Sequence, residues 1–264
     1  MIIYGTGLRI SDEIFSCTLP TDENLFGELS ASVCWEDVGK GRQGAALTKV
    51  DDETGDVPVV RTTAQYGSPT QRFQAVHERL AHQIQEYAEL PVTFNNAVIE
   101  RYTNAYTKMG SHSDQALDLA DESFIAVFSC YRNPESGPPR KLIFETKQHG
   151  DEKLEIPLDH HSIVVFSIAA NRRLKHRIVL DAPGQAADNQ WLGVTFRTAK
   201  TFLRFSDRIP YLPQGTRLTL ADEEQRRDFF RRRRRENTET DFVYPSLTYT
   251  VSEGDLMPPE ELET

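Results

Sequence analysis

Seven short runs of β-branched and aromatic residues decide the fold: FNNAVIERY (94–102), SFIAVFSCY (123–131), KLIFE (141–145), LEIP (154–157), SIVVFSI (162–168), HRIVLD (176–181) and WLGVTFRT (191–198). Polar segments with Gly and Pro separate them, such as NPESGPPR (133–140). Runs of this kind are typical of β-strands, and seven of them in about a hundred residues predict a sandwich or barrel. The chain is therefore predicted to be mainly β.

Two helices are predicted before these strands. Thr21 can cap a short helix over 22–33, because its hydroxyl accepts from free N–H groups and acidic residues follow. Ser68-Pro69-Thr70-Gln71 resembles a capping box, and apolar residues follow at helical spacing: Phe73, Val76, Leu80, Ile84 and Tyr87. Between the two helices, residues 39–58 are rich in Gly and charged side chains, which predicts a long mobile loop.

A charged tail follows Phe205. Thr219 can cap a helix through residues 221–239, and the stretch from Arg226 to Arg235 holds seven Arg and Asp228. That stretch carries +6, so the rest of the chain carries −16 against −10 for the whole. A solvated helix that pairs with acidic neighbours is favoured over a nucleic-acid arm. We expect the stretch to dock onto its own domain or a partner and to lie outside the substrate groove.

Composition excludes several classes of protein. Of the 264 residues 38% are hydrophobic and 27% charged, which excludes collagen-like, mainly disordered and membrane-spanning chains. A net charge of −10 gives the chain no overall attraction for nucleic acid or anionic membranes. Cys17, Cys34 and Cys130 form no C-x-x-C pair, so neither a disulfide framework nor structural zinc is predicted. The opening residues lack a signal peptide, and a cytoplasmic protein is expected, with the nucleus as the alternative.

His112-Ser113-Asp114 and the distant His176 suggest a metal site. Two imidazoles and one carboxylate can occupy one face of an octahedral ion, as in non-haem Fe(II) oxygenases. Residues two apart on an extended chain point the same way, so His112 and Asp114 can reach one ion. On the H-x-D pair alone, a surface His beside an Asp would be the favoured interpretation.

The surroundings resemble the AlkB-like branch of the Fe(II)- and 2-oxoglutarate-dependent dioxygenases. The similar segments occur in the family's order: RTTAQYG (61–67, the lid segment), NAVIERY (96–102), HSD (112–114), FIAVFSCYRNPE (124–135) with RKLIFE (140–145), HHSIVVFSIAANRRLKHRI (160–178) and VTFR (194–197). The resemblance implies a double-stranded β-helix, or jelly-roll. It implies a dioxygenase domain over 1–205, with N-terminal helices and lid to about residue 90 and the jelly-roll core over about 91–205, by analogy at fold level. Residues 206–264 would be an extension that packs on this domain or is partly disordered.

The resemblance also implies a cofactor and an activity. His112, Asp114 and His176 would bind Fe(II), and Tyr102 and Arg197 would contact 2-oxoglutarate. The family oxidises a C–H bond by hydroxylation or oxidative demethylation, consuming O2 and 2-oxoglutarate and releasing succinate and CO2. His149, His160 and His161 compete as ligands, but only His176 has the family's distance to TFR.

Two departures concern the 2-oxoglutarate pocket. Trp191 stands where the family usually has a second Arg, and Glu100 stands where it usually has Asn. Trp191 cannot bind a carboxylate by charge, so either the alignment shifts in register through residues 184–190 or part of the pocket differs and another cation serves. The candidates are Arg172, Arg173 and Arg204.

A further departure concerns the substrate. Gln115 and Ala116 follow the H-x-D pair where repair enzymes commonly have an acid, Asp118 and Asp121 come later, and Tyr66 is the lid segment's one aromatic. Tyr66 and Gln115 are the candidate substrate contacts. The leaning is to a small molecule or a protein side chain. The alternative is an AlkB-type demethylase of N-methylated DNA or RNA bases, and a third hypothesis is a jelly-roll binding protein without catalysis. The sequence does not predict an oligomeric state.

Overall fold

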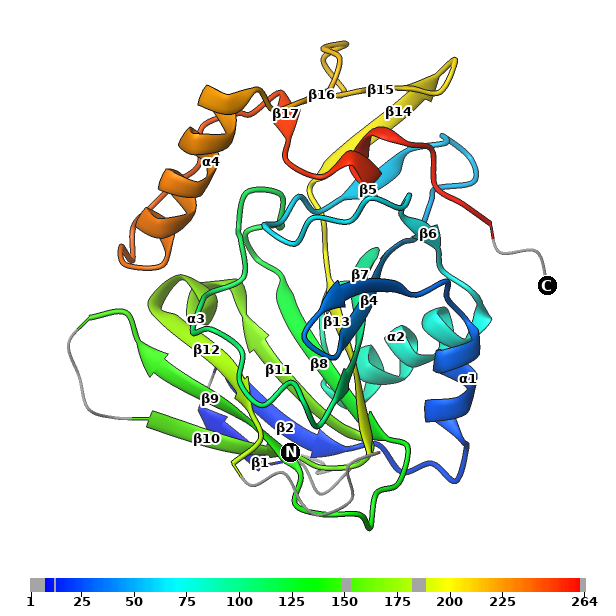
Figure 1. Cartoon of the computed structure of the whole chain (residues 1–264), viewed down its shortest axis with the longest axis vertical. Coiled ribbons are helices and arrows are strands. Elements are labelled where there is room, and N and C mark those ends of the chain that lie inside the picture. Colours follow the sequence, from blue (N-terminus) through cyan, green and yellow to red (C-terminus); the bar gives the residue numbers. More distant parts are fainter. Residues whose placement is uncertain (1–7, 12, 149–152, 182–188, 262–264) are drawn as a thin grey trace.

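Two antiparallel sheets pack face to face at the centre of the chain (Figure 1). The computed structural model describes residues 8–11, 13–148, 153–181 and 189–261. The larger sheet has the order β1-β2-β11-β8-β13-β7-β4-β3, with β6 beside β4. Its strands are β1 (Leu8–Ser11), β2 (Ile14–Thr18), β3 (Glu36–Gly39), β4 (Arg42–Thr48), β6 (Gln71–Arg72), β7 (Asn96–Thr103), β8 (Phe124–Tyr131), β11 (Ser162–Ser167) and β13 (Gln190–Arg197).

The smaller sheet has the order β10-β9-β12 and covers one face of the larger sheet. Its strands are β9 (Arg140–Thr146), β10 (Lys153–Leu158) and β12 (Leu174–Val179). Leu142, Phe144 and Ile178 of this sheet pack with Val127 and Phe166 of the larger one. All seven strand predictions are confirmed, as is the jelly-roll core.

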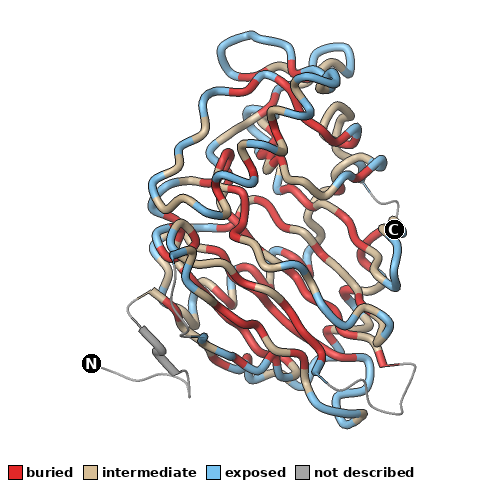
Figure 2. Tube along the Cα trace, turned by 60° about the vertical axis from the view of Figure 1, so that its left-hand side comes forward, coloured by how far each residue is buried: buried red, intermediate tan, exposed pale blue. Residues whose placement is uncertain are grey.

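Helices α1 (Leu25–Ala31) and α2 (Ala75–Tyr87) cover the other face of the larger sheet (Figure 1). Successive residues of a strand point to opposite faces, so β8 can contribute Val127 to one core and Phe128 to the other. The central strands of the larger sheet, β8, β11 and β13, are therefore buried on both sides, in agreement with the central red segments of Figure 2.

The predicted helix starts shift by a few residues. Asn24 caps α1 in place of Thr21, because its Oδ1 accepts from the backbone N–H of Gly27 at 3.1 Å. The helix predicted from Ser68 begins at Ala75, because the side chain of Gln71 bonds both backbone groups of Cys34 and holds residues 71–72 as a strand. The apolar residues Val76, Leu80 and Ile84 face the core as predicted.

The predicted loop over 39–58 is wrong for its first half. Residues 42–48 form β4, which pairs with β7 from Arg42↔Tyr102 to Thr48↔Asn96. The strand is hard to recognise in the sequence because glycine and alanine have low β-propensity. The continuous hydrogen-bonded ladder to β7 outweighs this low propensity. The burial of Ala45 and Leu47 adds to this pairing.

The remaining elements lie around one end of the two sheets (Figure 1). They are β5 (Val57–Val59), α3 (Ile168–Arg173), β14 (Thr201–Ser206), β15 (Ile209–Tyr211), β16 (Thr219–Leu220), α4 (Glu223–Glu236), β17 (Tyr249–Thr250) and the 3₁₀ turn η1 (Glu253–Leu256). Asp222 caps α4 in place of the predicted Thr219, and it forms a reciprocal capping box with Gln225. Among the described residues, no helix is both long and apolar enough to cross a bilayer.

Candidate active site

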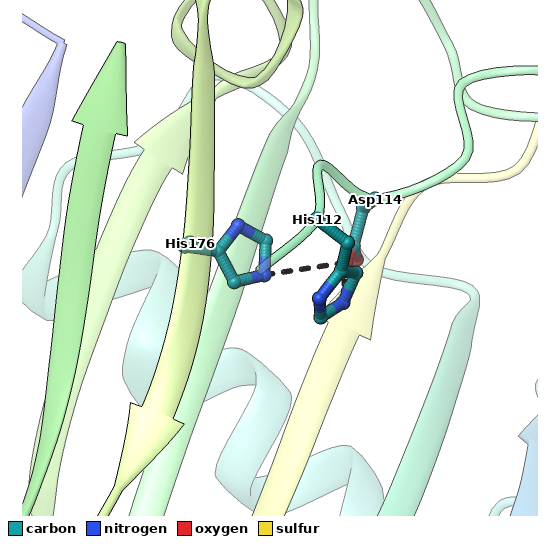
Figure 3. Close-up of side chains that lie close together, drawn as sticks. All are labelled: His112, Asp114 and His176. Atoms are coloured by element: carbon teal, nitrogen blue, oxygen red, sulfur yellow. Dashed lines mark ion pairs between the residues drawn. The ribbon is translucent and has the colours of Figure 1, made fainter. Parts of the chain in front are cut away.

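His112, Asp114 and His176 converge beside the smaller sheet (Figure 3). His176 lies on β12, the edge strand, whereas His112 and Asp114 lie in the connection between β7 and β8. His112 pairs with this edge as an isolated antiparallel bridge. The backbone N–H of His112 donates to the His176 carbonyl at 2.9 Å, and that of His176 donates back at 2.6 Å. This pairing sets the two imidazoles side by side, with ring centroids 4.7 Å apart.

The three side chains have the geometry of a ligand set. Their candidate ligand atoms all lie within 4.8 Å of one another. The Nε2 atoms of His112 and His176 lie 3.8 Å and 3.5 Å from Asp114 Oδ1. His112 Nδ1 donates to the Gly110 carbonyl at 2.9 Å, so the lone pair of the neutral ring is on Nε2, toward the other ligands. Two imidazoles and one carboxylate form the facial triad of non-haem iron oxygenases.

Electrostatics keep Asp114 and His112 in their metal-binding protonation states. Burial alone would raise the pKa of Asp114, but Arg197, His176 and His112 outweigh it and hold that pKa well below its usual range. Arg197 does so directly, since its Nε and Nη2 each lie 2.7 Å from Asp114 Oδ2. Burial, followed by the neighbouring His176, lowers the pKa of His112 to about 3. A metal needs an ionised carboxylate and a neutral imidazole, and both are present at neutral pH.

A cavity of about 310 Å³ opens beside the triad. His112, Asp114 and Arg197 line it, as do Thr62 and Thr63 of the lid segment. The volume is at the low end of the range for small-molecule sites, roughly 300–1,000 Å³. The cavity therefore has room for a cosubstrate and the reacting part of a second molecule.

One protein family matches the segment that contains this site. The model of the 2OG-Fe(II) oxygenase superfamily matches residues 39–197, more than half of the 264 residues. The chain belongs to this superfamily. It is therefore an iron- and 2-oxoglutarate-dependent dioxygenase, which uses O2 as the second cosubstrate. The family match does not support the hypothesis of a binding protein without catalysis, and His112, Asp114 and His176 could form the iron site.

One solved structure supports this fold, and a second resembles the chain more weakly. The structure of OsALKBH1 is 13% identical, covers 73% of this chain and 99% of its own, and superposes with a TM-score of 0.50. A crystal structure of a 2OG-Fe(II) oxygenase family oxidoreductase from Burkholderia pseudomallei is 14% identical, covers 70% of this chain and 88% of its own, and has a TM-score of 0.41. At such identities the likeness concerns the fold alone. No curated protein sequence matches the chain significantly.

Arg197 of the oxygenase fits a carboxylate ligand. It lies at the end of β13 and lines the cavity. Two of its guanidinium nitrogens contact Asp114, but the buried Nη1 has no hydrogen-bond partner among the described residues. A buried charged donor without a partner is costly, and a carboxylate of 2-oxoglutarate would satisfy it.

The second predicted cosubstrate contact, Tyr102, is placed differently. Tyr102 is fully buried, and its hydroxyl donates to Glu100 Oε2 at 2.6 Å. Glu100 lines the cavity instead and pairs with Arg42, whose Nη2 lies 2.6 Å from Oε1. Trp191 packs against Tyr102, with the two ring centroids 4.8 Å apart. Contact between Tyr102 and 2-oxoglutarate stays a prediction. In the structure, Glu100 lies between the hydroxyl of Tyr102 and the guanidinium of Arg42 and contacts both.

Arg42 is the cavity cation that the sequence interpretation missed, because β4 was predicted as loop. The three candidates that it offered are placed elsewhere. Arg172 pairs with Asp121, Arg173 with Glu13 and Arg204 with Asp56, all three arginines being exposed. None of these three lines the cavity.

The two candidate substrate contacts differ in position. Gln115 lines the cavity, is only 4% exposed, and has no hydrogen-bond partner for either amide atom in the described structure. Tyr66 is buried away from the cavity, with its hydroxyl 2.5 Å from the place of a Cβ on Gly44. Its backbone N–H donates to the hydroxyl of Ser252. Gln115 can meet a substrate as the structure stands, and Tyr66 cannot stack on one without leaving its packing.

One arginine of the 226–235 stretch reaches the cavity. Arg233 is buried and lines it, so the expectation that the whole stretch lies outside the site is wrong for this residue. Helical spacing explains the exception, because Phe229, Arg233 and Glu236 lie on one face of α4 and are buried together. In the sequence, the apolar Phe229 among the arginines was the signal that this face of α4 points toward the core. Docking of α4 onto the chain's own core agrees with the other expectation.

The competing residues lie elsewhere. His160 and His161 stack on one another with centroids 3.8 Å apart, and His160 accepts from the backbone N–H of Tyr131. His149 lies outside the described residues. Asp118 forms a buried pair with Arg61, and the exposed Asp121 pairs with Arg172. Neither acid lines the cavity.

Proposed function

We propose that this oxygenase oxidises a C–H bond in a small molecule or a protein side chain. The wall of the cavity supports this substrate class. Its three arginines each have an acidic partner: Arg42 pairs with Glu100, Arg197 with Asp114 and Arg233 with Glu236. Nucleic-acid binding depends mainly on cations that are free to neutralise phosphates. The walls hold neutralised cations, which suit a small polar substrate better.

The aromatic content of the cavity points the same way. Flipped or single-stranded bases are usually held by stacking on aromatic side chains. Tyr106 is the one aromatic in the described cavity lining, apart from His112, and Tyr66 is buried elsewhere. The unpartnered Gln115 amide offers a donor and an acceptor to a polar group of the substrate.

The chain's own groups would perform distinct tasks in this reaction. His112, Asp114 and His176 hold Fe(II), Arg197 keeps Asp114 ionised and offers Nη1 to a carboxylate of 2-oxoglutarate, and the lid segment shields the site from water. Iron and 2-oxoglutarate, when bound there, would supply the oxidising chemistry for a C–H bond of the substrate. The protein thus supplies position and shielding.

The unpaired thiols of Cys17, Cys34 and Cys130 support a reducing compartment such as the cytoplasm.

Demethylation of a nucleic-acid base is the second candidate, and α4 carries the observation that favours it. Arg227, Arg231 and Arg234 are exposed on this helix. Arg226 Nη2 donates to Gln65 Oε1 of the lid segment at 2.7 Å, which places the helix beside that segment, whose Thr62 and Thr63 line the cavity. An exposed row of arginines there could follow a phosphate backbone.

Succinate production separates the two candidates. The Fe(II)-loaded enzyme is given 2-oxoglutarate with methylated oligonucleotides, or with pools of metabolites and peptides, across a salt series. We expect stimulation by a metabolite or peptide and little from oligonucleotides. Robust formaldehyde release from an oligonucleotide, falling steeply with salt and with an Arg227→Ala/Arg234→Ala variant, would reverse the assignment. His176→Ala is the control, since it removes a ligand and should abolish turnover.

A further inference from the structure

Apart from the backbone bridge between His112 and His176, side chains hold the segment that carries two of the three metal ligands. This ligand loop is residues 112–116. The Asp114 backbone N–H donates to Asn171 Oδ1 at 2.7 Å, and Asn171 Nδ2 donates to the Asp114 carbonyl at 2.7 Å. Asn171 belongs to α3, which immediately precedes the strand of His176. This pair of bonds fixes the middle of the loop.

Further side-chain bonds to the loop come from the C-terminal end of α4. Asn237 Oδ1 accepts from the backbone N–H of Ser113 at 2.9 Å and from its hydroxyl at 3.1 Å. Arg233 Nη2 donates to the Ser113 carbonyl. Glu236 Oε1 accepts from the backbone N–H of Ala116 at 2.8 Å. We call Arg233, Glu236 and Asn237 the α4 clamp.

The α4 clamp is itself rigidly connected. Arg233 Nη1 donates to Glu236 Oε2 at 2.7 Å and to Asn237 Oδ1 at 3.1 Å. The hydroxyl of Tyr244 donates to the same Glu236 oxygen at 2.8 Å, and Lys147 Nζ donates to the Glu236 carbonyl at 2.6 Å. Arg233 and Glu236 are both buried. A buried ion pair is a poor source of net stability, since desolvation offsets most of its attraction, but it fixes geometry well.

We propose that the α4 clamp is a positioning element of the iron site. It holds Ser113 and Ala116, so that His112 and Asp114 on this loop meet His176 on β12. The clamp lies beyond residue 197, where the superfamily match ends. The C-terminal extension would thus complete the metal centre of this chain, and metal affinity would depend on its docking. This inference rests on the metal site and not on the proposed substrate class.

Metal binding without turnover tests the proposal. Co(II) is titrated into the metal-free full chain, with affinity from calorimetry and geometry from visible absorption. Residues that orient metal ligands typically contribute about 10–100-fold in affinity. Asn237→Ala removes the acceptor of three hydrogen bonds, so we expect a loss in that range and a changed Co(II) spectrum. Asn237→Asp keeps an acceptor at the same position and should retain affinity.

Controls keep the test specific. Arg235 lies in the same turn of α4 but pairs with Glu239 at the surface, so Arg235→Ala should bind Co(II) like the parent. Ser113→Ala removes one of the three donors to Asn237 and should give a smaller loss in the same direction. This variant serves if Asn237→Ala fails to fold by circular dichroism. Parental affinity and spectrum in the Asn237→Ala chain would overturn the proposal, as would equal losses in the Ala and Asp variants.

Discussion

The two halves of the metal site are held in different ways. His176 lies on β12, whose pairing with β9 runs from Leu174↔Thr146 to Val179↔Lys141, and Phe144 and Phe166 pack against its ring. The ligand loop with His112 and Asp114 depends on side chains from α3 and α4 for most of its hydrogen bonds. A ladder fixes a residue through backbone geometry that many sequences satisfy. Side-chain bonds require particular residues, some of them more than a hundred positions away.

Because the ligand loop depends on buried side-chain contacts, the largest loss of stability is expected from the buried Arg61–Asp118 pair, whose Asp118 follows the loop in the chain. Arg61 and Asp118 form an ion pair with 3% and 0% of their side chains exposed, and Arg61 Nη1 also donates to the carbonyls of Leu247 and Tyr249. Arg61→Ala would leave Asp118 buried and unpaired, which costs about 3–5 kcal/mol. Urea denaturation of the metal-free chain measures the loss. Arg204→Ala removes an exposed pair with Asp56 and should change stability little. Similar losses in the two variants would contradict the contrast.

Arg197 links the two halves and should affect cosubstrate binding next. Arg197→Ala removes the unpartnered Nη1, so 2-oxoglutarate should bind about a hundredfold more weakly, the effect of losing a few kcal/mol of charge-assisted hydrogen bonding. The pKa of Asp114 should also rise, because Arg197 is the main group that lowers it, so metal would be lost at a higher pH on acidification. The anaerobic charge-transfer band of iron with 2-oxoglutarate reports both effects. Tyr102→Phe should cost less, since that hydroxyl serves Glu100. Wild-type 2-oxoglutarate affinity in Arg197→Ala would remove this residue as an anchor.

The stability of the strands that support the site should depend on the shape of their side chains and not on charge. A Cβ on Gly193 of β13 would lie 2.1 Å from Cη2 of Trp191, which is buried against Tyr102. Gly193→Ala should therefore cost about 1–3 kcal/mol through overpacking. Gly39→Ala provides a contrast, since nothing lies within 4 Å of its Cβ position, although its φ of 85° carries strain of its own. Unfolding curves should show the Gly193 loss relieved in Gly193→Ala/Trp191→Leu, and persistence of the loss there would contradict a steric cause.

The same contrast explains what the sequence could predict. The seven strands follow from runs of β-branched and aromatic residues. The candidate ligands His112, Asp114 and His176 follow from the H-x-D pair and from the order of motifs shared with the AlkB-like branch. β4 did not, because its glycine and alanine gain their conformation only from pairing with β7. Arg42 and Arg233 were missed in the site for the same reason, since each meets the cavity through contacts far along the chain. The sequence showed that Glu100 and Trp191 stand where the family usually has Asn and Arg. It did not show that Glu100 pairs with Arg42.

An effect confined to acidic pH should come from a region apart from the site, the pair of helices on the outer face of the larger sheet. His77 of α2 is fully buried, and its Nδ1 accepts from the backbone N–H of Gln74 at 2.9 Å while Nε2 lies 2.8 Å from the hydroxyl of Ser32. Burial lowers its pKa from 6.5 to about 4. The unfolded chain therefore binds more protons between those pH values, and stability falls as pH drops through that window, by at most about 1.4 kcal/mol per pH unit for one group. His77→Gln should flatten the acid slope of the metal-free chain, whereas His82→Gln, on the exposed face of the same helix, should keep it. Denaturation at half-unit steps from pH 4 to 7 measures the difference, and equal slopes in the wild-type and His77→Gln chains would show that the acid sensitivity originates elsewhere.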